Sequence, residues 1–141
     1  TESQPWWEVD LGQEADISQV NIYNRTSCCS ERLRDFYILV SSQPFGASSL
    51  SDLINSPEVQ STFISGQIGT LGNIPFEVTG RYVRLQLSST NAVLHMAEVE
   101  VMGCPADPSA NPCLGTPPVS IDPAGPFTVD AGIQSMVANF V

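Results

Sequence analysis

The sequence predicts an all-β fold, either a β-sandwich or a jelly roll. Three features indicate this class: short segments that alternate apolar and polar residues, turn residues between those segments, and a single short segment with helical spacing. No alternation of helical and strand segments supports a parallel sheet. With 141 residues, the chain has room for one domain of ordinary size and part of a second.

Two predicted strands open the chain. Residues 6–12 alternate apolar and polar side chains before a glycine, and residues 17–23 repeat the alternation, as half-buried strands do. Strict alternation in the second strand places Ile17 on one face and Val20 and Ile22 on the other.

A third strand and the one helix follow. Residues 36–40 are apolar throughout, which predicts a strand covered on both faces. Residues 48–55 have helical spacing, with Ser48 or Ser49 as the cap and Pro57 after the end.

The next part of the chain returns to strands. We predict strands at residues 63–68, 74–78, 81–87 and 93–102. A turn at Thr79 and Gly80 separates the second of these from the third.

Composition changes after Gly103 and divides the chain into three parts. Residues 1–103 form the predicted β domain, and residues 104–118 are a proline-rich linker in which Cys104 and Cys113 close a local disulfide. Residues 119–141 resume the alternation and resemble the start of an immunoglobulin-like domain. Because both ends stop abruptly, we expect the chain to be a fragment of a longer secreted protein.

Composition also limits location and partners. Four cysteines and no lysine fit an oxidising compartment, so we expect a secreted or cell-surface protein. A net charge of −10 argues against nucleic acid, whose phosphates need a basic surface. No segment is long and apolar enough to insert into a membrane.

The stretch NRTSCCSER is the candidate binding site. Arg25 and Arg32 flank the adjacent cysteines Cys28 and Cys29. Each arginine offers a planar fork of donors that can grip two oxygens. Bonded to each other, the cysteines would form a flat apolar patch between the forks, which suits a sugar ring. The alternative is that the arginines pair with neighbouring carboxylates and the thiols are buried or reduced.

Other candidate residues have structural interpretations. His95, the one histidine, is read as a structural or surface residue. Trp6 and Trp7 are expected in the core, and Arg81 and Arg84 are expected to brace the fold through acids such as Asp10. No Ser-His-Asp set or paired-carboxylate cleft indicates catalysis.

Five segments carry a family resemblance: WWEVDLG, NRTSCCSER, FYILVS, RYVRLQL and AEVEV. In this order they resemble the F-type lectins (fucolectins), a branch of the discoidin or coagulation-factor type C superfamily, over residues 5–103. The tryptophan pair and the RYVR segment belong to the wider superfamily. The arginine-flanked cysteine pair is specific to the lectin branch.

The resemblance implies a fold and a ligand. The family fold is an eight-stranded, discoidin-like jelly roll with a sugar site in loops at one end. Arg25 and Arg32 would donate hydrogen bonds to L-fucose, and a Cys28–Cys29 disulfide would pack against the sugar ring. Binding without catalysis is the expected activity, with fucosylated glycans as partners.

The resemblance also implies Ca²⁺, with Glu98 and the Ala97 carbonyl among its ligands. This sequence departs from the family at two places. Ser27 replaces an aspartate that steadies the first arginine, and the ligand-binding histidine would fall before Thr1, together with the first strands and most calcium ligands. We therefore expect an incomplete metal site and weak or no binding by this chain.

Two other functions stay open at this stage. A discoidin-like adhesion module would use the same loops for a protein or another glycan. A targeting module would direct a glycoside hydrolase, encoded elsewhere in the same polypeptide, to its substrate. Useful avidity from such a single site would require repeats or oligomers.

Overall fold

The computed structural model describes residues 1–107, 109, 127–130 and 133–139. Its strands are β1 (Trp6–Tyr23), β2 (Arg34–Ser41), β3 (Val59–Gln67), β4 (Leu71–Leu87), β5 (Glu98–Pro105), β6 (Phe127–Asp130) and β7 (Ile133–Asn139). Two short helices are η1 (Ser30–Arg32) and α1 (Leu50–Asn55). Neither is long enough to cross a bilayer.

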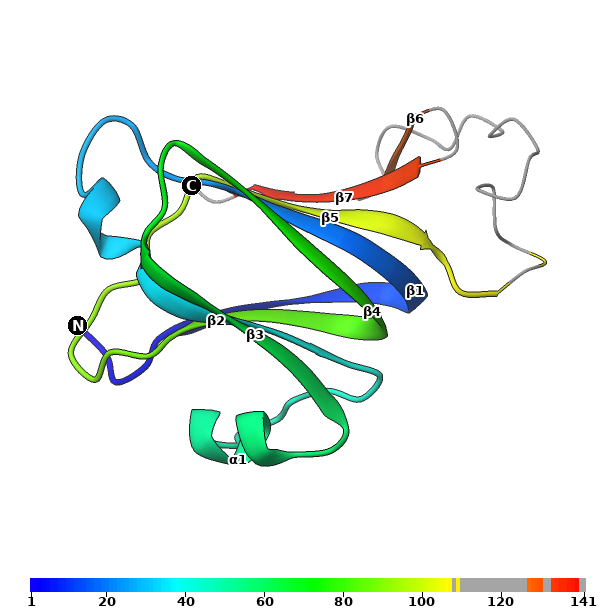
Figure 1. Ribbon diagram of the computed structural model, residues 1–141, viewed down its shortest axis with the longest axis horizontal. Helices are drawn as coiled ribbons and strands as arrows, with labels where there is room; N and C mark the ends of the chain where they lie inside the picture. Colours follow the sequence, from blue (N-terminus) through cyan, green and yellow to red (C-terminus); the bar gives the residue numbers. More distant parts are fainter. Residues whose placement is uncertain (108, 110–126, 131–132, 140–141) are drawn as a thin grey trace.

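The strands form two layers because β1 and β4 are long enough to belong to both. All pairings are antiparallel, in the order β3-β2-β4-β1-β5-β7-β6. The second half of β4 pairs with β2 and with the first half of β1, which makes the first layer. The second half of β1 pairs with the first half of β4 and with β5, which makes the second layer. Figure 1 shows the two layers facing each other. The predicted β-sandwich is confirmed.

The main core lies between these layers. Both contribute fully buried side chains, with Val20, Ile22 and Val99 from the second layer and Phe36 and Leu85 from the first. Removing such apolar side chains from water is the main driving force for folding. The core therefore fixes the two layers, and the loops between them, at defined positions.

The prediction that β2 is covered on both faces is confirmed. Ile38 and Val40 face the main core, whereas Leu39 packs outward against Phe45 and the helix α1. The helix begins at the predicted cap, because the Ser49 hydroxyl accepts a hydrogen bond from the Asp52 backbone N–H.

The expected alternation at 17–23 is wrong at one residue. Ile17 is buried together with Val20 and Ile22, so all three face the core. The pairing of β1 shifts between Ile17 and Gln19, and Ser18 is the extra residue of a β-bulge opposite β5. Opposite β4 the register shifts at the same place, but there the extra residue lies on β4, between Pro75 and Val78. The two predicted strands, 6–12 and 17–23, are parts of one bent strand.

The predicted turn at Thr79 and Gly80 is also wrong, because β4 continues through both residues. Gly80 pairs with Ala15 and lies against Val40 and Ser41 of β2, where a Cβ atom would collide with the Val40 side chain. The glycine is needed for close packing between strands. A sequence pattern does not distinguish that need from a turn.

The last predicted strand of the domain begins later and ends later than expected. β5 starts at Glu98, so residues 93–97 belong to a loop. It ends at Pro105, where Cys104 pairs with Asp16. The hairpin of β6 and β7 joins the edge of β5. The linker and immunoglobulin-like assignments stay predictions, since most of residues 108–126 lie outside the described residues.

Candidate functional site

A cleft of about 840 Å³ lies at one end of the sandwich. Its walls come from three segments and one further residue: residues 1–7, the end of β1 with the loop that follows it, residues 92–98 before and at the start of β5, and Thr70 before β4. Both loops connect one layer to the other, and Figure 1 shows them at the end where the N-terminus lies. The volume falls in the usual range for small-molecule sites.

Asn24 organises the loop after β1. Its side chain is 3% exposed; its Nδ2 donates to the carbonyls of Ser30 at 2.9 Å and Ile68 at 3.3 Å, and its Oδ1 accepts from the Arg25 N–H at 2.8 Å. The side chain thereby ties the loop to the segment before β4. A glycan on the Asn24-Arg25-Thr26 sequon would break these bonds. In the sequence, Asn24 stood out only as the first residue of the NRTSCCSER stretch.

Three of the five arginines form ion pairs among the described residues. These pairs are Arg34–Asp35 at 2.9 Å, Arg81–Asp10 at 2.7 Å and Arg84–Glu8 at 2.7 Å. The expected bracing role of Arg81 and Arg84 is confirmed. Arg25 and Arg32 have no carboxylate partner in this part of the chain. These are the two arginines that the sequence assigns to a ligand.

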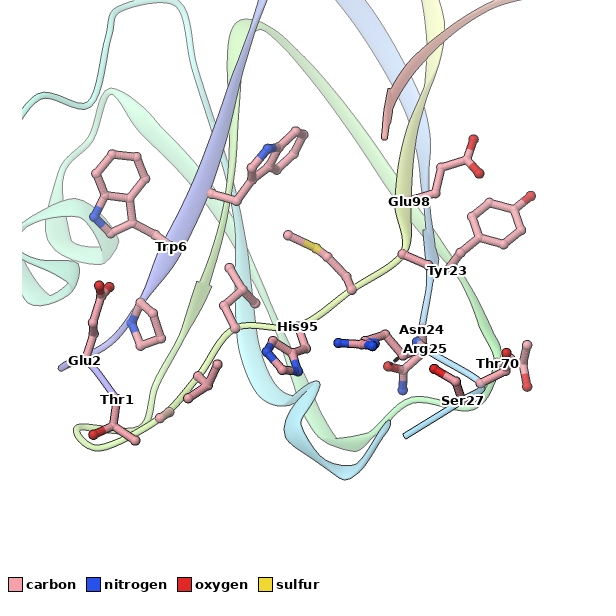
Figure 2. A pocket seen from close by; sticks show the side chains of 18 residues that line it. Thr1, Glu2, Trp6, Tyr23, Asn24, Arg25, Ser27, Thr70, His95 and Glu98 are labelled. Carbon is pink, nitrogen blue, oxygen red and sulfur yellow. Dashed lines mark hydrogen bonds between the residues drawn. The ribbon is translucent and has the colours of Figure 1, made fainter. Parts of the chain in front are cut away.

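The two arginines meet at His95. Arg25 and His95 line the cleft, and Figure 2 shows the Arg25 guanidinium directed toward the His95 ring. Arg32 Nη1 lies 3.4 Å from His95 Nδ1. Burial lowers the pKa of His95 below its usual value, and the charges of Arg32 and Arg25 lower it further. His95 was read from the sequence as a structural or surface residue, because its neighbours in space are distant in the chain.

Cys28 and Cys29 lie on the same loop, outside the cleft wall. Both are free cysteines, and Cys29 Sγ donates a hydrogen bond to Cys28 Sγ at 2.8 Å. This bond and burial raise the pKa of Cys29. The sulfurs are thus adjacent, and their disulfide stays a prediction. Cys113 lies outside the described residues, so the Cys104–Cys113 disulfide also stays a prediction.

Glu98 and Ala97 border the cleft at its other side. Figure 2 shows Glu98 beside Tyr23 and directed away from His95. Within the described residues, no group of three or more acidic, histidine or cysteine side chains is placed to hold a metal. One carboxylate and one carbonyl are too few for calcium, which takes about six to eight oxygens. These residues do not make a calcium site by themselves.

Trp6 corrects another expectation. Trp7 packs against the core, but Trp6 is 52% exposed at the edge of the cleft. The Arg84 guanidinium carbon lies 4.0 Å from the centre of the Trp6 ring and 4.8 Å from the centre of the Phe45 ring. The charge of the buried Arg84 is balanced by Glu8, so the indole is held by a rigid neighbour.

Comparisons with known proteins agree with this geometry. A family model described as a NedA-like, galactose-binding domain matches residues 1–85. A fucolectin from Anguilla anguilla is 36% identical over 102 residues, which make up 71% of this chain and 60% of that protein. An F-lectin from Morone saxatilis serum has a TM-score of 0.61 and 33% identity, covering 80% of this chain and 38% of that one.

The chain belongs to the F-type lectin family.

A fucose-binding module of Streptococcus pneumoniae, SpX-3, also has a similar structure. Its TM-score is 0.56 at 31% identity, over 72% of this chain and 68% of the module. The chain spans about half to 60% of the length of the curated fucolectins it matches. The F-type lectin assignment covers the β domain, and the immunoglobulin-like assignment of the C-terminal segment stays a prediction.

Proposed function

We propose that this chain is a carbohydrate-binding module for terminal L-fucose on glycans. The observation that carries the proposal is that Arg25 and Arg32 lack carboxylate partners in the described part of the chain, although Arg25 lines the cleft and Arg32 contacts His95, which also lines it. A charged donor without a partner at a cleft gains free energy when a ligand oxygen replaces water. The relatives named for fucose binding support the choice of sugar.

The arginine forks suit a pyranose because its ring oxygen and hydroxyls are acceptors at fixed spacing. A planar guanidinium can donate two parallel hydrogen bonds, which fixes the orientation of the sugar as well as its position. We also propose that a Cys28–Cys29 disulfide supplies an apolar surface under the C–H face of the sugar ring. Reversible loss of binding on treatment with a reductant tests that part separately.

We propose binding without catalysis, outside the cell, as part of a larger polypeptide. The similar proteins are named as lectins and binding modules, and one of them comes from serum. Calcium enters as an expectation of the resemblance alone, with Glu98 and the Ala97 carbonyl as proposed ligands.

The test is a titration of L-fucose into the 141-residue chain, followed by ¹H–¹⁵N NMR shifts, because a single sugar site is weak. The resemblance alone allowed weak or no binding by this chain, but because Arg25 and Arg32 lack carboxylate partners in its described part, we expect weak, saturable shifts in the loop after β1. Arg25→Ala and Arg32→Ala should each weaken binding by about tenfold or more, the value of one charge-assisted hydrogen bond. Arg25→Lys keeps the charge but loses the fork, so it should also bind less tightly than the unmodified chain.

Arg34→Ala is the matched control, since Arg34 lies in the same stretch but pairs with Asp35. L-rhamnose, another 6-deoxy sugar, is the matched ligand. A folded chain that responds equally to both sugars, or that loses binding equally in all three arginine-to-alanine variants, contradicts the proposal.

A calcium titration accompanies it. Because the described residues supply too few oxygens, we expect addition of CaCl₂ or EDTA to change the thermal midpoint of this chain little. A calcium-dependent rise of several degrees would show that residues outside the described part complete the site.

A further inference from the structure

His95 differs from the other groups of the cleft in its origin. It lies on the loop before β5, whereas Arg25 and Arg32 lie on the loop after β1. It is the one histidine of the chain, and it is distinct from the family histidine that the resemblance places before Thr1. Figure 2 shows it at the middle of the cleft, between Trp6 on one side and Arg25 on the other.

The contact with Arg32 determines which ring nitrogen carries the proton. A guanidinium has donors and no acceptor. At 3.4 Å from Arg32 Nη1, His95 Nδ1 can therefore only accept. A neutral ring whose Nδ1 accepts carries its hydrogen on Nε2. The pairing leaves one N–H donor of His95 for another partner.

The same contact joins two loops. Arg32 is exposed at the end of the three-residue helix η1, and the contact with His95 restricts the rotamers that its side chain samples. Holding Arg32 against His95 brings Arg32 to the ring toward which the Arg25 guanidinium is directed. A sugar that binds there meets donors whose positions are already restricted, which lowers the entropy lost on binding.

We propose that His95 is a positioning and binding residue of the sugar site: its Nδ1 holds Arg32 beside Arg25, and its Nε2–H donates to a ligand hydroxyl. The proposal rests on the proposed function. It gives the cleft a third donor beside the two guanidinium groups, and such donors fit the acceptor lone pairs of the oxygens of a pyranose.

The first test reads the tautomer. Because the chain has a single histidine, its ring nitrogens give one unambiguous set of long-range ¹H–¹⁵N NMR signals. We expect the Nε2–H tautomer in the unmodified chain and a mixture of tautomers in Arg32→Ala. L-fucose should shift the Nε2 signal. A dominant Nδ1–H tautomer overturns the proposal.

The second test compares two substitutions. His95→Ala should weaken L-fucose binding by about tenfold. His95→Gln should recover part of that loss, because its amide can accept from Arg32 and donate to the sugar. Thermal unfolding checks that each variant is folded; if His95→Ala is not, His95→Gln and the tautomer carry the test.

The outcomes separate the two proposals. If the unmodified chain binds L-fucose and His95→Ala binds equally well, the role of His95 is overturned and the proposed function stands. If the folded, unmodified chain shows no response to L-fucose, the proposed function is overturned, and the role of His95 in sugar binding falls with it.

Discussion

The Asn24 side chain holds the loop after β1 in place. Its buried amide makes three hydrogen bonds: two within the loop, to Arg25 and Ser30, and one to Ile68 in the segment before β4. Buried polar groups left without partners are costly, so the loop depends on this one side chain. The residue that holds the loop is therefore adjacent to Arg25, which the loop presents.

Replacing Asn24 with alanine should reduce both stability and binding. We expect Asn24→Ala to lower the free energy of unfolding by about 2–3 kcal/mol, since two carbonyls and one N–H lose their partner. Urea denaturation measures the change. Asn73→Ala, the same substitution at an exposed position of β4, is the control and should cost little. Equal effects of the two substitutions would contradict the role of Asn24.

Asp35 makes stability depend on acid pH. Its carboxylate accepts from the Gly66 N–H at 2.7 Å and from Arg34 Nε at 2.9 Å, and these bonds, led by that to Gly66, lower its pKa. A lowered folded-state pKa contributes stability above the usual aspartate value of 3.8, and that contribution is lost as the pH falls through the folded value.

Urea midpoints of the unmodified chain and of Asp35→Asn should therefore differ near pH 6 and converge near about pH 2. Asparagine is a fair replacement because Asp35 has a positive φ of 49°, which asparagine tolerates. Parallel pH profiles for the two proteins would show that Asp35 does not contribute in this way.

The residues of the site differ in how far the sequence alone could identify them. Arg25 and Arg32 were predicted because they flank the cysteine pair in one short motif. His95 was missed as a site residue because its contact with Arg32 spans 63 positions and depends on how two loops meet. Asn24 was missed because a buried amide that caps a loop has no local pattern.

At the scale of the elements, most strands were predictable and their joints were not. The predictions of β2 and of the cap of α1 are confirmed. Both depend on local composition, which the sequence contains. The bulge at Ser18 and the continuity of β4 through Gly80 depend on neighbouring strands, which a local pattern does not contain. Trp6 was assigned to the core because the tryptophan pair is usually part of the core in such a fold, but its stacking on Arg84 allows it to lie at the surface.

Gly103, the glycine of β5, should tolerate substitution poorly. A Cβ atom there would meet the backbone of Asp16 and the Cα of Ile17, which cannot move without opening β1. We expect Gly103→Ala to cost about 1–3 kcal/mol of folding free energy. Gly69→Ala is the matched control, because a Cβ at Gly69 meets open space. Thermal unfolding of both variants checks this. A Gly103→Ala protein as stable as the unmodified chain would contradict the close packing of Gly103 against β1.

At the scale of the whole molecule, the salt dependence of binding distinguishes a neutral sugar from an anionic ligand. The chain carries a net charge of −10, yet Arg25 at the cleft and Arg32 beside it lack carboxylate partners in the described part of the chain. A neutral sugar binds through hydrogen bonds, so affinity for L-fucose should change little between about 50 and about 500 mM NaCl. A steep fall in affinity with salt would indicate that the preferred ligand is an anion.

The passage of β1 and β4 through both layers has a consequence for how the protein opens. The two layers cannot separate without breaking β1 or β4, because each of these strands belongs to both layers. Native-state hydrogen exchange should therefore give the central amides of β2 and β5 the same opening free energy, although they lie in different layers. Since both loops of the cleft run from one layer to the other, the ligand site should persist until the whole sandwich opens in a single cooperative event.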